Sequence, residues 1–284
     1  MSIVRDSVLG CLLGGGLGDA LGGIAERGRA CLSDDTQLTL ATCESITAAR
    51  GVDPNHLALT FRTWFEQHRL TGLGSSTLKA LRDLEAGSHW ALAGARGEMA
   101  AGNGGAMRIA PLAFVPGVDR VVIRDVVRIT HHSDEAYIGA LAVLEAIRGA
   151  WPPELPDVLN EIAERLPDSR VRDRLRATAE ITRYAGPTAI AATFGTSGYV
   201  VDTVPLALAA AWQMLRRFED TLDELVRIGG DTDTIASIAG QVAGARIGAP
   251  TLPAGLLQSL PDRDLIEAVG DNFAVYVETA HLTH

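Results

Sequence analysis

The sequence is poor in cationic side chains, and above all in lysine. Its 284 residues contain 25 Lys and Arg against 35 Asp and Glu, a formal net charge of −10, and Lys79 is the single lysine. A general nucleic-acid binder needs a cationic surface that displaces counterions from phosphates, and docking on an anionic membrane needs the same charge. We therefore expect neither general nucleic-acid binding nor attachment to a membrane.

Cysteine and aromatic residues are also scarce. The three cysteines, Cys11, Cys31 and Cys43, are an odd number without a Cys-x-x-Cys spacing. This argues against a disulfide framework or a structural zinc site and is typical of a reducing compartment. Aromatic residues make up 5% of the chain, whereas hydrophobic residues make up 47%. The core is therefore expected to consist of Ala, Leu, Val and Ile, with many glycines.

The sequence lacks a hydrophobic run long enough to span a membrane. Residues 8–17 resemble the apolar part of a signal peptide, and residues 9–11 resemble a lipoprotein cleavage site. However, Cys11 stands too early for an apolar segment to precede it. Asp19 interrupts the run well short of the roughly 20 residues that a membrane helix needs. We expect a soluble cytoplasmic protein.

Apolar residues recur mostly at helical spacing, and strand patterns are sparse. Residues 136–147 and 266–280 each place apolar side chains on one helical face. The Asp-Pro pair that opens residues 53–69 predicts a helix there, and Pro205 predicts the first turn of another. Residues 120–129 fit either a helix or a strand. We predict an all-α, single-domain bundle with many helices.

Small residues form two ridges on the predicted helices. Gly10, Gly14, Gly18 and Gly22 recur every four residues, and residues 236–244 carry a second set of small side chains. Each glycine costs about 0.5–1 kcal/mol relative to alanine inside a helix, so a close approach by another backbone should compensate. We predict that the two helices pack against each other or against neighbours in the centre of the bundle. Direct contact between the glycines and a ligand is the alternative.

Two acidic clusters stand at predicted helix starts. Residues 33–36 read Ser-Asp-Asp-Thr, and residues 230–234 read Gly-Asp-Thr-Asp-Thr. Helix capping explains either cluster alone, but a cap needs one side-chain oxygen. If the clusters converge, four carboxylates share a partly buried volume, and such unpaired charge requires a cation. Oxygen donors without neighbouring His or Cys favour Mg²⁺ or Mn²⁺, and four acids suffice for two ions.

Residues 102–108 read Gly-Asn-Gly-Gly-Ala-Met-Arg and predict a phosphate-binding loop. Successive glycines let backbone N–H groups point into one concavity, and Asn103 tolerates a left-handed conformation. An ordinary turn before Met107 is the alternative. We expect Arg108 either to pair with an acid or to touch the substrate. His131 is either a structural hydrogen-bonding residue or part of a pocket.

Six motifs in this order resemble those of the ADP-ribosylglycohydrolase family. They are residues 14–22, 33–36, 102–108, 130–131, 197–199 and 230–234. The ordered pair of acidic clusters, with the Asn-Gly motif between them, is the specific part of the resemblance. It implies an all-α orthogonal multi-helix bundle, in which residues 1–284 form a single domain with a binuclear Mg²⁺ or Mn²⁺ centre.

The resemblance also implies roles for individual residues. It implies metal ligands at Ser33, Asp34, Asp35, Asp231, Asp233 and Thr234. It implies contacts with ADP-ribose at Gly102, Asn103, Gly104, Gly105, Met107, His131, Gly198 and Tyr199. Tyr199 would stack on the adenosine end of the substrate, and packing in the core is the alternative role for its ring. His132 is expected to be structural.

The activity implied by the resemblance is metal-dependent hydrolysis of the glycosidic bond at C1″ of an ADP-ribosyl group. Its substrate is modified protein or another ADP-ribosyl conjugate, and Glu26, Asp35 and Asp233 are the candidates for proton transfer. Glu26 lies seven residues after Asp19, at the offset of a family glutamate. The segment from Glu26 to Ser33 is shorter than the family usually has, so Glu26 pairing with Arg27 and Arg29 at the surface is the alternative.

Two other classes of function stay open at this stage. One is a non-catalytic ADP-ribose-binding regulatory module, which the short segment after Glu26 favours. The other is a purely structural protein, against which the intact set of acidic residues argues. The acceptor linkage, the choice between Mg²⁺ and Mn²⁺, and the oligomeric state are not determined by the sequence.

Overall fold

The computed structural model describes residues 2–97 and 100–283, apart from the side chains of Ala25, Glu26 and Thr283. Helices dominate this part of the chain, as the sequence predicts, and none of them is both long and apolar enough to cross a membrane. The α-helices are α1 (Ile3–Gly22), α2 (Ile24–Arg27), α3 (Asp34–Ala49), α4 (Pro54–Glu66), α5 (Ser75–Glu85), α6 (Arg120–Arg128), α7 (Asp134–Arg148), α8 (Leu155–Glu164), α9 (Arg170–Thr182), α10 (Pro187–Phe194), α11 (Val200–Met214), α12 (Phe218–Ile228), α13 (Thr232–Ile247), α14 (Ala254–Gln258) and α15 (Arg263–Thr283). The shorter elements are β1 (Ala95–Arg96), β2 (His131–His132) and the 3₁₀ turns η2 (Asn103–Gly105), η3 (Ala110–Phe114) and η4 (Ala249–Thr251).

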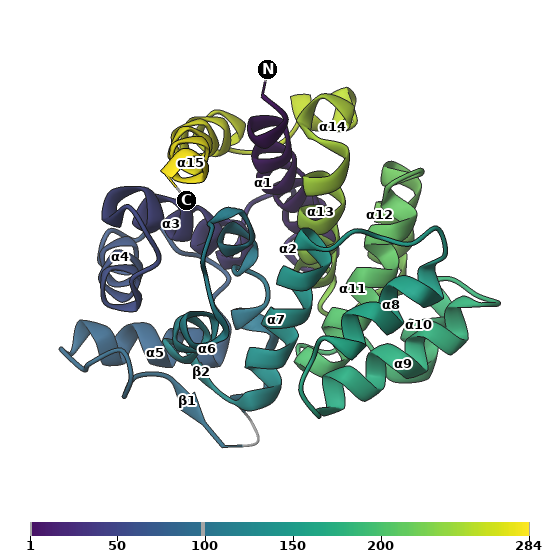
Figure 1. The fold of residues 1–284 in the computed structure, drawn as a ribbon, viewed down its shortest axis with the longest axis horizontal. Helices are drawn as coiled ribbons and strands as arrows, with labels where there is room; N and C mark the ends of the chain where they lie inside the picture. Colours follow the sequence, from purple (N-terminus) through teal and green to yellow (C-terminus); the bar gives the residue numbers. More distant parts are fainter. Residues whose placement is uncertain (1, 98–99, 284) are drawn as a thin grey trace.

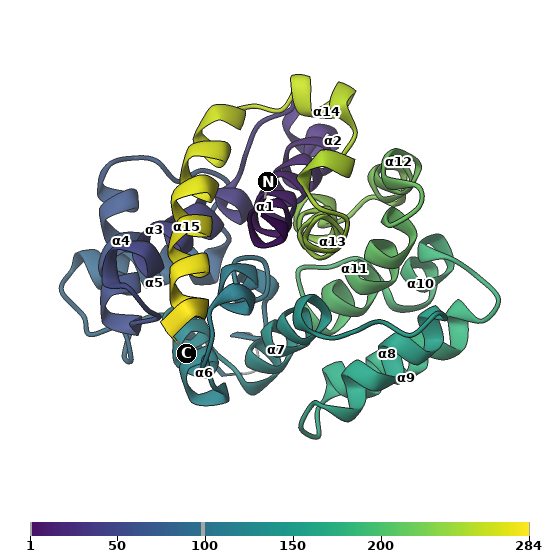
Figure 2. The same cartoon turned by 45° about the horizontal axis from the view of Figure 1, so that its top comes forward.

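Helices α1 and α13 lie side by side in the middle of the molecule (Figure 1). Helices α3, α4 and α5 lie on one side of this pair, and α8, α9, α10 and α12 lie on the other (Figure 1). Helix α15 runs along α1 and α3, and α11 and α7 pack near α13 (Figure 2). The all-α prediction is therefore confirmed, and the central pair packs the first helix against a helix from the last fifth of the chain.

The central helices meet through a glycine seam, formed by Gly10, Gly14, Gly18 and Gly22 of α1 and Ala236, Gly240 and Gly244 of α13. A Cβ atom added at Gly14 would collide with the carbonyl oxygen of Gly240. One added at Gly22 would lie 2.5 Å from the carbonyl oxygen of Thr232. The close backbone approach predicted from the spacing of the glycines is confirmed.

Most of the predicted helices are present with small changes at their ends. Residues 136–147 lie in α7 and residues 266–280 in α15, and the ambiguous residues 120–129 form α6. The prediction for Pro205 is wrong, because α11 begins at Val200 and Pro205 lies inside the helix. The preceding residues are mostly β-branched and have low helix propensity. Val200, Val201 and Val204 are buried in the core, so packing outweighs their local preference.

Candidate metal centre and substrate cleft

The two acidic clusters meet at one end of a cleft. Ser33 caps the start of α3, and Asp231 stands at the N-cap of α13. The hydroxyl of Thr232 donates to the carbonyl oxygen of Gly22 at 2.9 Å, which fixes the start of α13 beside the end of α1. The Thr234 hydroxyl lies 3.3 Å from Asp35 Oδ2. The structure therefore brings together the two segments whose convergence the metal hypothesis requires.

Three carboxylates form the centre of this acidic cluster. Asp19, Asp35 and Asp233 each offer an oxygen within 4.8 Å of the others. Asp19 is fully buried, and its Oδ2 accepts a hydrogen bond from the Ser33 N–H at 2.8 Å. Asp19 lies in the family motif of residues 14–22 but was not predicted to be a metal ligand. A charged residue between glycine and alanine on an otherwise buried helix was the signal that could have identified it.

Burial and mutual repulsion raise the pKa values of several carboxyl groups in this cluster. Burial, followed by the charges of Asp19 and Asp233, raises the pKa of Asp34 to about 8. Burial also raises the pKa of Asp231 to about 6 and that of Asp35 well above its ordinary value. The carboxylates therefore resist collective ionisation unless a positive charge lies among them.

The donor set of the cluster fits a hard divalent cation. Asp35 Oδ1 is buried and accepts no hydrogen bond within the described residues, so one oxygen of this carboxylate is free to bind a cation. The surrounding donors are carboxylate and hydroxyl oxygens, which Mg²⁺ and Mn²⁺ prefer. The residues that could hold such ions are Asp19 and the predicted ligands Ser33, Asp34, Asp35, Asp231, Asp233 and Thr234, and the assignment of the predicted ligands stays a prediction.

Arg27 supplies a positive charge to this cluster, a role that the sequence did not predict. Its Nη1 lies 2.9 Å from Asp233 Oδ2, and its Nη2 lies 3.3 Å from Asp19 Oδ1. Nη2 also donates to the backbone carbonyls of Asp19, at 2.6 Å, and Cys31, at 3.0 Å. Arg27 therefore does not lie in a solvated surface cluster. The side chain of Glu26 lies outside the described residues.

The cleft beside the acidic cluster has a volume of about 1190 Å³. The predicted site residues that line it are Asp34, Asp35, Gly102, Asn103, Gly104, Met107, His131, Gly198, Tyr199, Asp231, Asp233 and Thr234. Ser33 is not among the lining residues, because its hydroxyl lies behind them, 2.7 Å from Asp19 Oδ1. Gly105 instead faces α6, where an added Cβ would lie 2.8 Å from Val127 Cγ1.

The Asn-Gly loop differs in conformation from the expected phosphate nest. Residues 103–105 form the 3₁₀ turn η2, none of them with positive φ. The Asn103 N–H donates to the Gly198 carbonyl at 3.0 Å, so it is not available to a phosphate. The Asn103 side chain instead donates to Asp231 Oδ2 at 2.5 Å and to the Thr203 hydroxyl at 3.0 Å. The loop thus orients one of the predicted ligands.

Behind the loop lies a buried arginine. Arg108 donates to the Gly104 carbonyl at 2.7 Å, the Val126 carbonyl at 3.2 Å and the Thr130 hydroxyl at 2.9 Å. Among the described residues it forms no ion pair with a carboxylate, so the expected pairing with an acid is wrong. The positive charge of Arg108 therefore lies beneath the Asn-Gly loop, and no described carboxylate forms an ion pair with it.

The remaining predicted residues differ in their surroundings. His132 Nε2 lies 2.7 Å from the Ala93 carbonyl oxygen, a contact that fits a structural role. Tyr199 is half-buried, and its hydroxyl accepts a hydrogen bond from Arg170 Nη1 at 3.3 Å. Gly198 and Tyr199 pair with the Asn-Gly loop, since Gly102 bridges to Tyr199. Tyr199 and its partner Arg170 both line the cleft.

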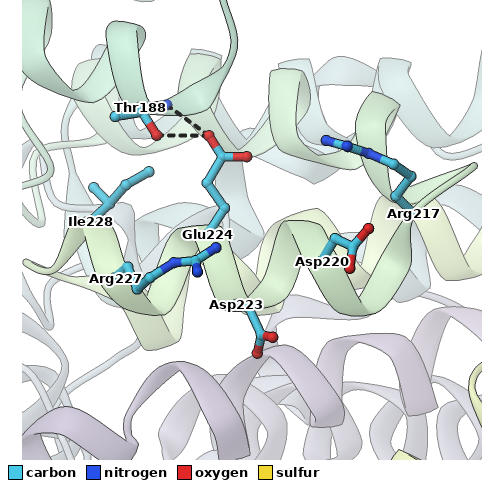
Figure 3. Close-up of a pocket in the computed structure, with 7 residues that line it drawn as sticks. All are labelled: Thr188, Arg217, Asp220, Asp223, Glu224, Arg227 and Ile228. Atoms are coloured by element: carbon cyan, nitrogen blue, oxygen red, sulfur yellow. Dashed lines mark hydrogen bonds between the residues drawn. The ribbon is translucent and has the colours of Figure 1, made fainter.

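A second cavity of about 610 Å³ lies between α10 and α12. It is lined by Thr188, Arg217, Asp220, Asp223, Glu224, Arg227 and Ile228. Glu224 points toward Thr188 and accepts hydrogen bonds from its hydroxyl and its backbone N–H, while the other charged side chains are spread along the helix (Figure 3). Three acids and two arginines nearly balance in charge, so the cavity does not have the concentrated acidity of the main cleft.

The fold and the site together define a class of all-α proteins with a cluster of buried carboxylates at one end of a large cleft. Within that class, the chain belongs to the ADP-ribosylglycohydrolase family, which it matches over residues 1–282. It is 30% identical over 242 residues to an uncharacterized protein of Archaeoglobus fulgidus, covering 83% of this chain and 77% of that protein. It is 26% identical to the ADP-ribosyl-[dinitrogen reductase] glycohydrolase of Rhodospirillum rubrum, over 90% and 91% of the two chains. Among solved structures it resembles an ADP-ribosylglycohydrolase-related protein complex, with a TM-score of 0.73, 28% identity and coverage of 98% and 100%.

Proposed function

We propose that this protein removes ADP-ribose from a conjugate by hydrolysing the glycosidic bond at C1″, with two divalent ions, Mg²⁺ or Mn²⁺, in the acidic cluster. Membership of the ADP-ribosylglycohydrolase family supports hydrolytic removal of ADP-ribose. The observation that carries the proposal is the meeting of Asp19, Asp35 and Asp233 at the end of a cleft lined by the Asn-Gly loop. Such a cleft offers both a reacting end and a binding end.

The acidic residues would hold the ions, and the Asn-Gly loop and His131 would hold the ADP-ribose. Divalent ions bound there would lower the pKa of a water molecule and polarise the ribose. Asn103 keeps the Asp231 carboxylate in one orientation through its 2.5 Å hydrogen bond. The N-termini of α3 and α13 point their positive dipole ends toward the same carboxylates, which partly offsets their repulsion.

In the hydrolysis, water adds to C1″ as the bond between C1″ and the acceptor atom breaks. One proton leaves the attacking water, and one proton joins the departing acceptor, so a carboxyl group that both takes and gives a proton balances the step. Asp35 and Asp233 are candidates for this group, since both carboxyl groups lie in the acidic cluster at the end of the cleft. Asp233 Oδ2 is held by Arg27. Glu26 remains a further candidate from the sequence.

The proposal is tested by a substrate panel in the presence of Mg²⁺, Mn²⁺ or EDTA. The panel contains arginine-, serine- and nucleic-acid-linked ADP-ribose and O-acetyl-ADP-ribose, with free ADP-ribose as the measured product. We expect turnover of at least one conjugate that EDTA abolishes. The variant Asp231→Ala should stay folded but lose bound metal and most activity.

Two outcomes contradict the proposal in different ways. Metal-dependent binding of ADP-ribose, measured by calorimetry, without turnover of any conjugate would indicate the regulatory binding module instead. Wild-type activity in Asp231→Ala would contradict the ligand assignment while leaving the hydrolysis intact. The substrate panel must identify the acceptor, because the family motifs do not include the loops that would contact the leaving group.

A further inference from the structure

A buried chain of hydrogen bonds connects Arg108 to the cleft through Thr130 and His131. Arg108 and Thr130 are fully buried, and only 3% of His131 is exposed. Arg108 Nη2 donates to Thr130 Oγ1 at 2.9 Å, and Thr130 Oγ1 lies 2.7 Å from His131 Nδ1. The proposed hydrolysis gives no part to Arg108 or Thr130, yet both are enclosed together beneath the wall of the cleft.

The donors and acceptors along this chain determine where the protons lie. A guanidinium has only donors, so Thr130 Oγ1 must accept from Arg108. The single hydroxyl proton of Thr130 then needs an acceptor, and His131 Nδ1 lies within hydrogen-bonding distance of it. If Nδ1 carried a proton instead, the buried hydroxyl proton would face two donors and stay unpaired, which is costly. The satisfied arrangement leaves the imidazole proton on Nε2.

The imidazole is neutral in these surroundings. Burial lowers the pKa of His131 to about 3, and the neighbouring charges of Arg108 and His132 act in the same direction. A neutral ring carries one proton, so the tautomer decides which ring nitrogen donates.

Nε2 of His131 lies against the Asn-Gly loop. A Cβ atom added at Gly102 would lie 3.0 Å from Nε2, and one added at Gly104 would lie 2.7 Å from Cε1. His131 and both glycines line the cleft. The two glycines therefore leave room for the ring, and the ring places its Nε2 edge beside the loop.

We propose that Arg108 and Thr130 are positioning residues that hold His131 as its Nε2–H tautomer, so that the ring donates a hydrogen bond to an oxygen of the bound ADP-ribose. The identity of the ligand rests on the proposed function, whereas the tautomer is a property of the protein alone. Arg108 adds a second constraint, because its hydrogen bond to the Gly104 carbonyl fixes the loop against the same ring.

The experiment uses protein with ¹⁵N-labelled histidine and a long-range ¹H–¹⁵N spectrum, which reports the protonated nitrogen of each ring. The chain has seven histidines, and the variant His131→Gln identifies the signals of His131 by their disappearance. We expect the wild type and Thr130→Ser to carry the proton on Nε2. Thr130→Val, which keeps the branched shape but loses the hydroxyl, should show the Nδ1–H form or a mixture.

Binding of ADP-ribose is measured by calorimetry on the same proteins. Loss of one hydrogen bond predicts about tenfold weaker binding for Thr130→Val, with binding retained by Thr130→Ser. The matched control is Thr178→Val, since Thr178 is also fully buried but its hydroxyl has no partner in the described structure. It should change neither the tautomer nor the affinity, and thermal unfolding verifies that each variant is folded.

An Nδ1–H signal for His131 in the wild type would overturn the inference. So would an unchanged tautomer and affinity in Thr130→Val. If the wild type shows the Nε2–H form but does not bind ADP-ribose, the proposed function fails while the tautomer assignment stands. The two failures are therefore distinguishable in one set of measurements.

Discussion

Replacing Arg27 by methionine removes the only described cation within ion-pair distance of Asp19 and Asp233 while keeping a similar apolar stem. Only 19% of the Arg27 side chain is exposed. Loss of one partner from a buried pair costs about 3–5 kcal/mol, because the other charge stays buried without compensation. We expect the free energy of unfolding of the metal-free protein to fall by about 3 kcal/mol, near the lower end of that range because the site is partly open to water.

The assay is urea unfolding in EDTA and in saturating Mg²⁺. Ligands that bind only the folded state stabilise it in proportion to their affinity, and in Arg27→Met a divalent cation no longer competes with the guanidinium. The gain in stability from Mg²⁺ should therefore be larger in the variant than in the wild type. Arg29→Met is the matched control, since Arg29 is exposed and close in sequence, and it should change stability by less than about 0.5 kcal/mol.

Two results would refute this reasoning. Equal stability of Arg27→Met and the wild type in EDTA would mean that Arg27 does not compensate the acids. An equal Mg²⁺-dependent gain in both proteins would mean that the cation and the guanidinium do not share the cluster. The first result concerns the charge balance of the protein, and the second concerns where the cation binds.

Three further predictions concern the glycine seam, the titration of Asp34 and the Asn-Gly loop. Gly18→Ala places a Cβ atom against the α13 backbone and should lower the unfolding free energy by about 3 kcal/mol, whereas Gly51→Ala, in open space, should leave urea unfolding nearly unchanged. The folded pKa of Asp34 is raised to about 8 from 3.8, so the unfolded chain ionises first and metal-free stability should fall as pH rises from about 4 to 8. Unfolding at pH 6 and 8 tests this, and a stability that rises with pH would be the contrary outcome. Asn103→Ala frees the Asp231 carboxylate and should lower kcat by about tenfold or more with less effect on KM; unchanged kcat would show that Asn103 does not orient it.

The central helix pair could be predicted from the sequence because it follows from the spacing of small residues, whereas the meeting of the two acidic clusters was only a condition of the metal hypothesis. Glycines at every fourth position lie on one side of a helix whatever surrounds it. The close approach of these glycines to another backbone could therefore be predicted without any knowledge of side-chain contacts, and the structure confirms it at Gly14. The two acidic helix starts meet because both lie beside the end of α1, where Thr232 donates to the Gly22 carbonyl and the Ser33 N–H donates to Asp19.

The contacts that depend on tertiary packing were not predictable in the same way. Arg27 looked like one of several surface arginines, and only the turn through residues 23–33 directs it inward to Asp233. The Asn-Gly loop was expected to present free N–H groups. Pairing with Gly198 uses the N–H of Asn103 instead, and that partner lies 95 residues away along the chain.

The glycine seam also has a consequence for the dimensions of the cleft. Main-chain atoms face each other along it, so no rotamer change is available to absorb a small displacement of either helix. Gly10 stands about 18 Å from Gly22, at 1.5 Å per residue, and both are parts of one rigid rod. A tilt introduced at the remote Gly10 end should therefore be transmitted along the seam to the acidic turn at the start of α13, and so change the width of the cleft's acidic end.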